Sequence, residues 1–292
     1  MSRINGHTQV YGVIGDPIGH SFSPQIHAYF AQQCGKNWAY LPFHVTGENI
    51  PAALAGAHAL GIRGLNVTIP HKQAVMPHLA RVAPMAQRVG SVNTLLWTPE
   101  GYIGTNTDYA GIQRSLSAVG ENFAGKAVAV LGAGGSAYAA CVAAAEGGAS
   151  GIVLFNRSVK NAQFLATHVN TYYNTSVRVI EGFDEPEHGC TIVLQTTSVG
   201  FGAQEGRSPV AGAAFFEGVQ TALDVVYAPW ETAFLRQARA AGVPTTLNGF
   251  PMLVYQAAEA FCLWAGAAPE ELSDAYLPEY IAFLGGQCQS GA

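Results

Sequence analysis

Short apolar runs alternate with segments of helical periodicity over the first seventy residues. The alternation predicts three strands and two helices, in the order strand 11–15, helix 23–35, strand 39–45, helix 50–60 and strand 64–69. Ser23 is a suitable N-cap for the first of these helices, and Pro24 fits its first turn. A strand–helix–strand series of this kind predicts an α/β layer whose strands run parallel.

A second series follows a helix that we predict over residues 108–119. Its strands are expected at 126–131, 151–155, 177–180, 191–195, 222–226 and 244–246. A long helical pattern from Met252 to Trp264 has no strand after it, and we expect it to pack back on the first series. The sequence therefore predicts an α/β protein of two α/β domains, one of residues 1–109 and 249–292 and one of residues 110–248.

The composition agrees with two folded domains and argues against several classes of protein. The chain has 292 residues, 49% hydrophobic and 11% charged, which is enough for two cores. Lysine and arginine total only 14 and the formal net charge is -5, so nucleic acid is not an expected partner. No apolar stretch approaches the roughly 20 residues that span a bilayer, and the first residues lack the apolar core of a signal peptide. We therefore expect a cytoplasmic protein without membrane contact.

Cysteine and histidine give no indication of a metal site or of disulfides. The five cysteines are widely scattered and form no Cys-x-x-Cys pair, so we expect reduced thiols. Four of them suit buried positions, whereas Cys288 lies in a polar tail that we expect to fray. The nine histidines show no metal-ligand spacing, and no metal is expected.

A glycine-rich turn joins a buried-type strand to an alanine-rich helix, at Gly132-Ala133-Gly134-Gly135-Ser136-Ala137. In this pattern the first glycine permits a tight turn, the second lets the backbone approach a pyrophosphate, and the alanine keeps the helix close to the strand. The N-terminus of the helix adds N–H groups and the positive end of its dipole. We interpret the segment as a dinucleotide-binding turn, and a plain turn between strand and helix is the alternative.

The next predicted strand ends at the polar triplet Asn156-Arg157-Ser158. An NAD enzyme usually has an aspartate or glutamate here, about 20 residues after the turn, to bind the ribose hydroxyls. A carboxylate would repel a 2′-phosphate, whereas a guanidinium attracts it and can bind it in a fork. Lys160 adds positive charge nearby. The sequence therefore predicts NADP as the cofactor, unless Arg157 is only a solvated loop residue.

Polar residues gather in four short segments of the first domain: Ser21-Phe-Ser23, Asn66-Val-Thr68-Ile-Pro-His-Lys72, Ser91-Val-Asn93-Thr94 and Asn106-Thr107-Asp108. Serine, asparagine and threonine can bind a polyhydroxylated ligand through paired hydrogen bonds. Lys72 and Asp108 are the titrating pair among them that can move a proton. Each segment alone has a structural alternative, because these residues could also cap helices or tie loops.

Taken in order, these segments resemble the shikimate dehydrogenase family, including its quinate-acting relatives, over nearly the whole chain. The matching segments are 15–24, 66–72, 90–94, 104–111, the glycine turn, 156–158, Asp224-Val-Val-Tyr227-x-Pro229 and Met252-Leu-Val-Tyr-Gln256. The resemblance implies a reversible, NADPH-dependent reduction of 3-dehydroshikimate to shikimate, which is a step toward chorismate and the aromatic amino acids.

The resemblance also implies roles for individual residues in binding the substrate. Ser21 and Ser23 would bind its carboxylate, and its hydroxyls would be bound by Asn66, Thr68, Asn93, Asp108 and Gln256. Lys72 and Asp108 would be the catalytic pair, and Tyr227 would lie near the carboxylate or the nicotinamide. An ammonium suits the chemistry, because negative charge builds on the carbonyl oxygen as hydride reaches the carbon. His71, beside Lys72, is not expected to take a direct part.

The cofactor site is implied in the same way. NADP would be bound by Gly132, Ala133, Gly134, Gly135, Ser136, Ala137, Asn156, Arg157, Ser158, Thr197, Val226 and Gly249. Two positions depart from the family's usual pattern, since Gln195 stands where asparagine is usual and Pro251 where glycine is usual. Proline removes flexibility and an N–H group. These departures affect the expected nicotinamide contacts, but not Lys72 or Asp108.

Three other functions compete with shikimate oxidoreduction. A dehydrogenase acting on quinate is the nearest, although quinate-preferring relatives often carry threonine where this chain has Ser23. A cofactor-binding sensor without turnover is disfavoured by the presence of both Lys72 and Asp108. A dehydrogenase acting on a folate has a related layout and would not turn over shikimate. The sequence is compatible with a monomer and with a homodimer.

Overall fold

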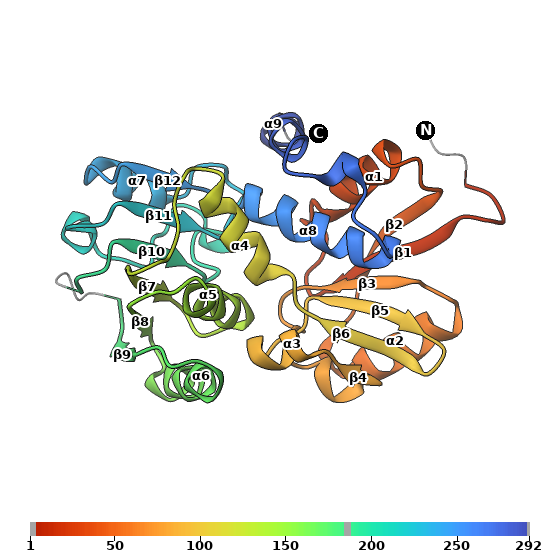
Figure 1. Cartoon of the computed structure of the whole chain (residues 1–292), viewed down its shortest axis with the longest axis horizontal. Helices are drawn as coiled ribbons and strands as arrows, with labels where there is room; N and C mark the ends of the chain where they lie inside the picture. Colours follow the sequence, from red (N-terminus) through yellow and green to blue (C-terminus); the bar gives the residue numbers. More distant parts are fainter. Residues whose placement is uncertain (1–3, 184–187, 291–292) are drawn as a thin grey trace. The chain divides into compact units, whose positions relative to one another are not determined.

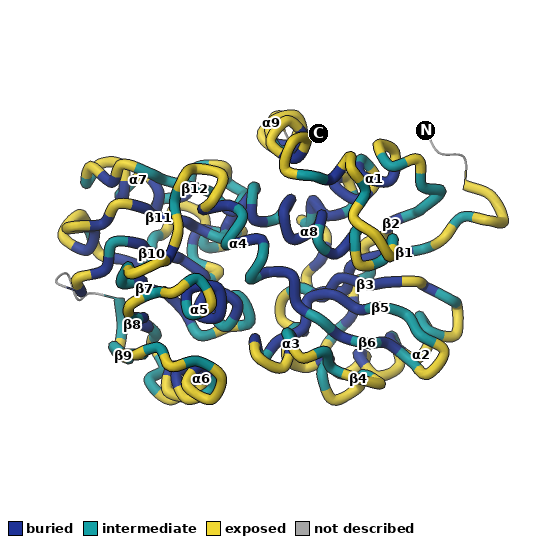
Figure 2. The backbone as a smooth tube through the Cα atoms, in the orientation of Figure 1, coloured by how far each residue is buried: buried dark blue, intermediate teal, exposed yellow. Residues whose placement is uncertain are grey.

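The computed structural model divides the chain into two compact units (Figure 1), and we describe residues 4–183 and 188–290 of it. Unit 1 consists of residues 1–107 and 253–286. Unit 2 consists of residues 108–252 and 287–292. In both units the central strands of the sheet are the most buried, and the edge strands are more exposed (Figure 2).

Unit 1 contains a six-stranded sheet in the order β2-β1-β3-β5-β6-β4. Its strands are β1 (Gln9–Gly15), β2 (Trp38–His44), β3 (Gly64–Val67), β4 (Arg81–Val82), β5 (Thr94–Thr98) and β6 (Gly101–Thr105). β1 pairs in parallel with both β2 and β3, as the strand–helix–strand pattern predicts. The carboxyl ends of these three strands therefore meet at one edge of the sheet.

The second half of this sheet was not predicted from the sequence, and its strands are not all parallel. The apolar pattern predicts no strand between Pro70 and Asp108, but β4, β5 and β6 form there. β5 runs antiparallel to β3 and to β6, and β4 pairs in parallel with β6. Only Pro99 and Glu100 separate β5 from β6, and a connection this short joins antiparallel neighbours.

The two faces of the unit 1 sheet are covered by different helices. On one face, Ile14 and Leu65 pack with Ile50 and Leu54 of α2 (Ile50–Ala59). On the other face, Tyr11, Val13 and Tyr40 pack with Trp264 of α8 (Phe250–Ala265). A Cβ at Gly64 would lie 2.2 Å from Nε1 of Trp264, so glycine is what lets α8 approach β3 this closely. The same Nε1 donates a hydrogen bond of 3.0 Å to the carbonyl of Leu95.

α1 (Ser23–Gln33) begins one residue earlier than the capping pattern predicts. Its N-cap is Phe22, and Ser23 is the first helical residue, so Ser23 does not cap the helix as expected. Pro24 lies in the first turn, where its missing N–H is not needed. The short helix α3 (Pro84–Val89) lies between β4 and β5 in the chain.

Unit 2 contains a six-stranded parallel sheet in the order β12-β11-β10-β7-β8-β9. Its strands are β7 (Ala127–Leu131), β8 (Gly151–Asn156), β9 (Val177–Glu181), β10 (Ile192–Gln195), β11 (Thr221–Asp224) and β12 (Thr245–Leu247). This is the strand order of dinucleotide-binding sheets, in which chain direction across the sheet reverses between β7 and β10. Ligands of such sheets bind at the carboxyl ends of the strands, beside that reversal.

The helices of unit 2 are α4 (Asp108–Ser117), α5 (Gly135–Glu146), α6 (Val159–Tyr172) and α7 (Ala233–Ala240). On one side of the sheet, Leu131, Phe155 and Val193 pack with Phe216 and with Phe234 of α7. α5 is nearly all small residues on its buried side, and it packs closely against β7 and α4. Gln113 of α4 donates a hydrogen bond of 3.1 Å to the carbonyl of Ala143 in α5.

The C-terminal segment is a helix and not the frayed tail that its polarity suggests. α9 spans Leu277–Ser290 and includes Cys288. Leu277, Tyr280 and Leu284 are buried, and the ring of Tyr280 lies 5.1 Å from that of Tyr29 in α1. The aromatic contacts with α1 stabilise a helix that its own sequence specifies weakly.

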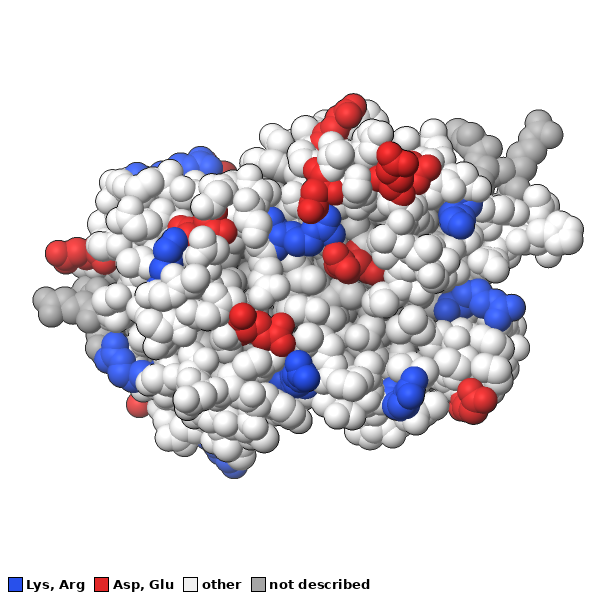
Figure 3. Space-filling view, viewed as in Figure 1, with Lys and Arg blue, Asp and Glu red and all other residues white. Residues whose placement is uncertain are grey.

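Charged residues are scattered and intermingled over the face that Figure 3 shows. All five cysteines are free thiols. Within the described ranges, no helix combines the length and apolarity needed to cross a membrane. In the same part of the chain, no group of three or more His, Cys, Asp and Glu side chains is arranged to hold a metal ion.

Candidate active site

The opening loop of unit 1 places Ser21 and Ser23 at the start of α1, just after the carboxyl end of β1. The N–H of Ser21 donates to the carbonyl of Ile18 at 3.0 Å. The hydroxyl of Ser21 accepts a hydrogen bond of 3.3 Å from the N–H of Ser23. The two hydroxyl-bearing residues are therefore held in one turn, as a shared ligand would require.

Asn66 lies in β3, and its buried amide has partners in β2, in β5 and in the residue just before β5. Tyr40 of β2 donates its hydroxyl hydrogen to Oδ1 of Asn66 at 2.7 Å. The Nδ2 of Asn66 donates to the carbonyl of Asn93 at 3.1 Å and to Oγ1 of Thr94 at 3.2 Å. The residues that the sequence places in separate polar segments thus meet in one cluster.

Asn93 is the centre of that cluster. Its Oδ1 accepts from the N–H of Thr107 at 2.8 Å and from Oγ1 of Thr94 at 2.9 Å. Its Nδ2 donates to Oγ1 of Thr107 at 3.0 Å and to Oε1 of Gln256 at 3.2 Å. Gln256 belongs to α8, more than 160 residues later in the chain. Unit 1 therefore brings Asn66, Asn93 and Gln256 together, as the site prediction needs.

Thr68 and Lys72 follow β3 in a turn and are half-buried. The N–H of Thr68 donates to the carbonyl of Ile14 at 3.0 Å, and the carbonyl of Lys72 accepts from the N–H of Val92 at 2.8 Å. His71 is fully buried, and its Nε2 donates to the carbonyl of Val45 at 2.5 Å. This contact gives His71 a structural role in the turn.

Asp108 is buried and is the first residue of α4 in unit 2. It directly follows Thr107, whose backbone N–H is fixed by Asn93 in unit 1. The pairing of Asp108 with Lys72 stays a prediction from the sequence.

The glycine turn of unit 2 follows β7 and leads into α5. Gly132 has a φ of +113°, and a Cβ there would lie 2.9 Å from Oγ1 of Thr196, so both backbone conformation and space require glycine. A Cβ at Gly134 would meet no atom within 4 Å, so the backbone there is open to approach. Ala137 lies in the first turn of α5 and is fully buried. This geometry suits a pyrophosphate at the helix N-terminus, which supports the dinucleotide interpretation.

The triplet at the end of β8 has two structural residues and one exposed cation. Asn156 donates from Nδ2 to the carbonyl of Ser158 at 2.9 Å. Ser158 caps α6 by accepting from the N–H of Asn161. Arg157 lies between them and is exposed. Lys160 lies with Nζ 5.7 Å from the centre of the Phe164 ring.

Comparison with known proteins gives the family. The family model described as the shikimate dehydrogenase substrate binding domain matches residues 13–95. The NADP(+) shikimate dehydrogenase of Moorella thermoacetica is 38% identical over 296 aligned positions, which cover the whole of both chains. This chain belongs to the shikimate dehydrogenase family.

Solved structures of the shikimate dehydrogenase family and its neighbours match in fold along the chain. A shikimate 5-dehydrogenase of Thermus thermophilus, described in complex with NADP(H) and shikimate, is 33% identical with a TM-score of 0.82. The match covers 96% of this chain and 99% of that one. A 5-ketofructose reductase of a Gluconobacter species, in its ligand-free form, is 29% identical with the same TM-score of 0.82. That match covers 96% of this chain and 100% of that one, so the fold alone does not fix the substrate.

Gln195 is the first departure from the family's usual residues, and its side chain connects two loops by hydrogen bonds. It is fully buried at the end of β10. Its Oε1 accepts from the N–H of Thr197 at 2.6 Å, and its Nε2 donates to the carbonyl of Val199 at 3.0 Å and to Oδ1 of Asp224 at 3.3 Å. The loops that carry Thr197 and Val226 are therefore coupled through one side chain.

Asp224, at the end of β11, is the carboxylate that receives this bond. Its Oδ1 also accepts from the N–H of Val226 at 3.0 Å, and its Oδ2 accepts from Oγ1 of Thr232 at 2.7 Å. Burial raises the pKa of Asp224 to about 7, while the hydrogen bonds from Thr232 and Val226 act in the opposite direction. Asp224 is the first residue of the segment that contains Tyr227, but no sequence pattern marks it as a buried carboxylate.

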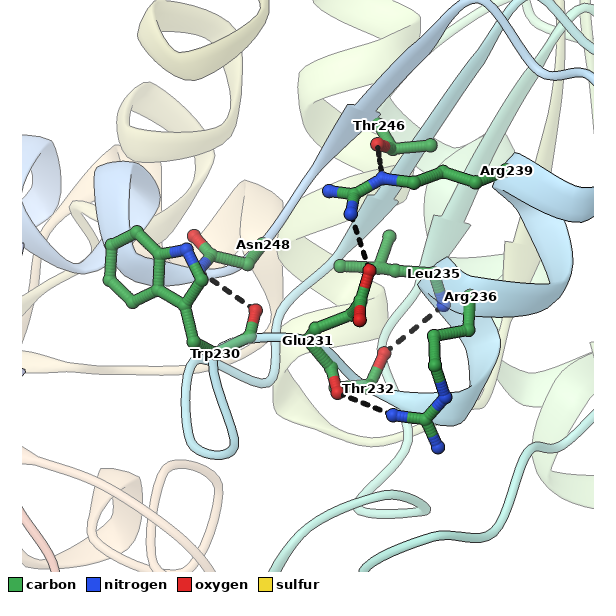
Figure 4. A network of polar contacts seen from close by, with 8 residues as sticks. All are labelled: Trp230, Glu231, Thr232, Leu235, Arg236, Arg239, Thr246 and Asn248. Carbon is green, nitrogen blue, oxygen red and sulfur yellow. Dashed lines mark hydrogen bonds and ion pairs between the residues drawn. The ribbon is translucent and has the colours of Figure 1, made fainter. Parts of the chain in front are cut away.

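A polar network anchors the loop after β11 to α7 and β12 (Figure 4). Asn248 donates from Nδ2 to the carbonyl of Trp230 at 3.2 Å. Glu231 forms an ion pair with Arg239 of α7, whose Nε donates to Oγ1 of Thr246 at 2.9 Å. The half-buried Tyr227 thus lies on a loop whose later residues, Trp230 and Glu231, are fixed by a hydrogen bond and an ion pair.

Pro251, the second departure, lies in the first turn of α8, where a missing N–H does not cost a helical hydrogen bond. The preceding Gly249 is required by packing, because a Cβ there would lie 2.0 Å from the carbonyl oxygen of Val225. Phe250 between them is fully buried, with its ring 6.5 Å from Tyr227 and 5.5 Å from Trp230. Proline is therefore compatible with the local structure.

Proposed function

We propose that this chain is an NADP-dependent shikimate dehydrogenase, which catalyses the reversible reduction of 3-dehydroshikimate to shikimate. The observation that carries the proposal is the full-length match to the Moorella enzyme, 38% identical with no part of either chain left over. The polar cluster of Asn66, Asn93 and Gln256 supports it, because a polyhydroxylated ring needs several neutral hydrogen-bonding groups held close together.

In this proposal the discontinuous domain of residues 1–109 and 249–292 binds the acid, and residues 110–248 bind NADP. Ser21 and Ser23 bind the carboxylate of the substrate, and Tyr227 lies near it or near the nicotinamide. The ring hydroxyls are bound by Asn66, Thr68, Asn93, Asp108 and Gln256.

NADP, when bound, supplies or takes up the hydride. Lys72 holds a proton on its ammonium and gives it to the oxygen of the substrate carbonyl as that oxygen gains negative charge. Asp108 orients the ammonium and accepts a hydrogen bond from the neighbouring hydroxyl. In the reverse direction Lys72 takes the proton back from the hydroxyl, so the reaction balances without a metal-bound group.

The residues of unit 2 fit an NADP cofactor. The open backbone at Gly134 and the start of α5 suit the pyrophosphate. Exposed Arg157 can bind the 2′-phosphate in a fork. Contacts from Gly132, Ala133, Gly135, Ser136, Ala137, Asn156, Ser158, Thr197, Val226 and Gly249 complete the proposed set. The proposal includes a cytoplasmic location, and both a monomer and a homodimer are compatible with it.

An initial-rate assay of the purified protein tests the substrate. Absorbance of NADPH is followed with shikimate and with quinate in the presence of NADP, and with 5-ketofructose in the presence of NADPH. We expect the highest kcat/KM with shikimate. A higher kcat/KM with quinate, or with the 5-ketofructose suggested by the Gluconobacter neighbour, would replace the proposed substrate. Binding of NADP without turnover of any of them would indicate a sensor instead.

A further inference from the structure

Backbone groups fix the orientation of every amide in the unit 1 cluster. The N–H of Thr107 can only donate, so the atom of Asn93 that faces it at 2.8 Å is the oxygen. The carbonyl of Asn93 can only accept, so the atom of Asn66 that faces it at 3.1 Å is the nitrogen. The carbonyl of Leu253 likewise fixes Nε2 of Gln256 at 2.8 Å.

This orientation determines which hydrogen bonds Asn66 can still form with a ligand. Both hydrogens on its Nδ2 are engaged, one by the carbonyl of Asn93 and one by Oγ1 of Thr94. Its Oδ1 accepts from the hydroxyl of Tyr40 at 2.7 Å. An amide oxygen has two lone pairs, so Oδ1 can accept one more hydrogen bond. Asn66 can therefore accept from a ligand but cannot donate to it.

Tyr40 is itself held in place by a ring stacked on its own and by a hydrogen bond at its hydroxyl. It is 9% exposed, and His27 of α1 stacks on it with ring centres 4.2 Å apart and planes 8° apart. Burial raises the pKa of Tyr40 well above its usual value, while a hydrogen bond from Ser23 acts the other way, so the phenol stays protonated and able to donate. Burial also lowers the pKa of His27 to about 3, which the nearby Asn66 opposes, so the stacked ring is neutral.

We propose that Tyr40 is a positioning residue of the substrate site. It holds Asn66 so that the amide can accept a hydrogen bond from a substrate hydroxyl but cannot donate one to it. The phenol reaches two residues expected to bind the acid, Ser23 and Asn66, without being expected to touch it. This inference rests on the proposed function, because it takes Asn66 to contact the substrate. It predicts that loss of one phenolic oxygen weakens recognition of the acid and leaves recognition of NADP unchanged.

Tyr40→Phe tests the inference, with Tyr102→Phe as a matched control. Tyr102 is also buried in unit 1, and its hydroxyl donates at 2.7 Å to the carbonyl of Ile62, away from the cluster. We expect Tyr40→Phe to raise the KM for shikimate about five- to tenfold, with kcat and the KM for NADP changed less than about twofold. Tyr102→Phe removes an equivalent hydrogen bond and is expected to lower thermal stability without changing any KM. Equal KM values for shikimate in Tyr40→Phe and wild type would overturn the inference.

A double-mutant cycle separates positioning from general stability. If Tyr40 acts through Asn66, adding Tyr40→Phe to Asn66→Ala raises the KM for shikimate no further. Additive effects would overturn the inference. Thr94→Val tests the other end of the same amide, because it releases one Nδ2 hydrogen, and we expect the KM for shikimate to rise about threefold. An unchanged KM in both Thr94→Val and Tyr40→Phe would leave no positioning role.

Binding of shikimate measured by calorimetry gives a readout that does not depend on turnover, and the Kd is expected to follow the KM. A wild-type protein that neither binds nor turns over shikimate overturns the proposed function. A wild-type protein that turns it over, with no change in Tyr40→Phe, overturns the present inference alone.

Discussion

The two units hold their polar site residues by different means. In unit 1, the neutral side chains of Asn66, Asn93 and Gln256 belong to one hydrogen-bonded cluster and are oriented by backbone groups. In unit 2, the geometry is carried by the backbone of the glycine turn, and a single buried carboxylate, Asp224, ties the neighbouring loops. We therefore expect recognition in unit 1 to depend on the identity of many side chains, and recognition in unit 2 to depend on the path of the chain and on few side chains.

Replacing the proposed proton donor should have the largest effect. Lys72→Met removes the ammonium, and we expect kcat to fall by a factor of about 100 to 10,000 with the KM for NADP unchanged. Lys36→Met, which removes a lysine between α1 and β2 of the same unit, serves as the control and should keep kcat. Steady-state kinetics of both variants measure this, and near-normal turnover of Lys72→Met would contradict general acid–base work by Lys72.

A corresponding substitution in unit 2 should change the KM for the cofactor and leave the KM for the acid nearly unchanged. Arg157→Glu replaces the expected 2′-phosphate ligand by a repelling charge, and we expect the KM for NADP to rise about 100-fold. The KM for NAD and for shikimate should change little. Arg178→Glu, at an exposed arginine of β9, is the control. Equal effects of the two variants on the KM for NADP would remove Arg157 from the site.

The coupling of the two loops through Gln195 can be broken directly. Gln195→Leu removes the bonds to Thr197, Val199 and Asp224, and we expect the KM for NADP to rise about 10- to 30-fold. Gln195→Asn, which restores the family's usual residue, keeps an amide and should change this KM less than about threefold. An unaltered KM in Gln195→Leu would show that the loops do not need the side chain.

The titration of Asp224 should appear in the pH dependence of stability. Burial raises its pKa in the folded protein to about 7, whereas an unfolded aspartate titrates near about 4. Between these values the folded chain retains a proton that the unfolded chain has lost. The free energy of unfolding therefore falls as pH rises through this window, by up to about 1.4 kcal/mol per pH unit, and levels off above the folded pKa.

Asp224→Asn should remove this contribution. The difference in the free energy of unfolding between wild type and Asp224→Asn, from urea titrations between pH 4.5 and 8, should decrease with rising pH up to about 7. A difference that is independent of pH would contradict the raised pKa.

Much of the secondary structure could be predicted from the sequence, because strands such as β7, β8 and β10 are nearly continuous apolar runs. The β5–β6 hairpin could not, since its strands carry threonine, tryptophan and glycine without a clear alternation. α9 could not be predicted either, because Gly285 and Gly286 disfavour a helix in this segment. Aromatic contacts with α1 stabilise the helix that forms. Both depend on tertiary packing, which overrides local preference.

The same limit applies to the candidate site. Sequence segments indicated Asn66, Asn93 and Gln256, and the structure brings these three into one cluster. The sequence could not indicate Tyr40, which reaches Asn66 across 26 positions, or the bond from Gln195 to Asp224 across 29. Such partners come from strand order, and neither residue type nor spacing marks them. The pairing of Lys72 with Asp108 is still a prediction from the resemblance.

The most direct test of the account is a crossed measurement of kcat/KM for shikimate and quinate, each with NADP and with NAD. We attribute the choice of acid to the side-chain cluster of unit 1 and the choice of cofactor to Arg157 in unit 2. We therefore expect the highest kcat/KM for shikimate with NADP, and the same preference for shikimate whichever cofactor is used. A preference for quinate, a preference for NAD, or no turnover in any of the four combinations would contradict the account.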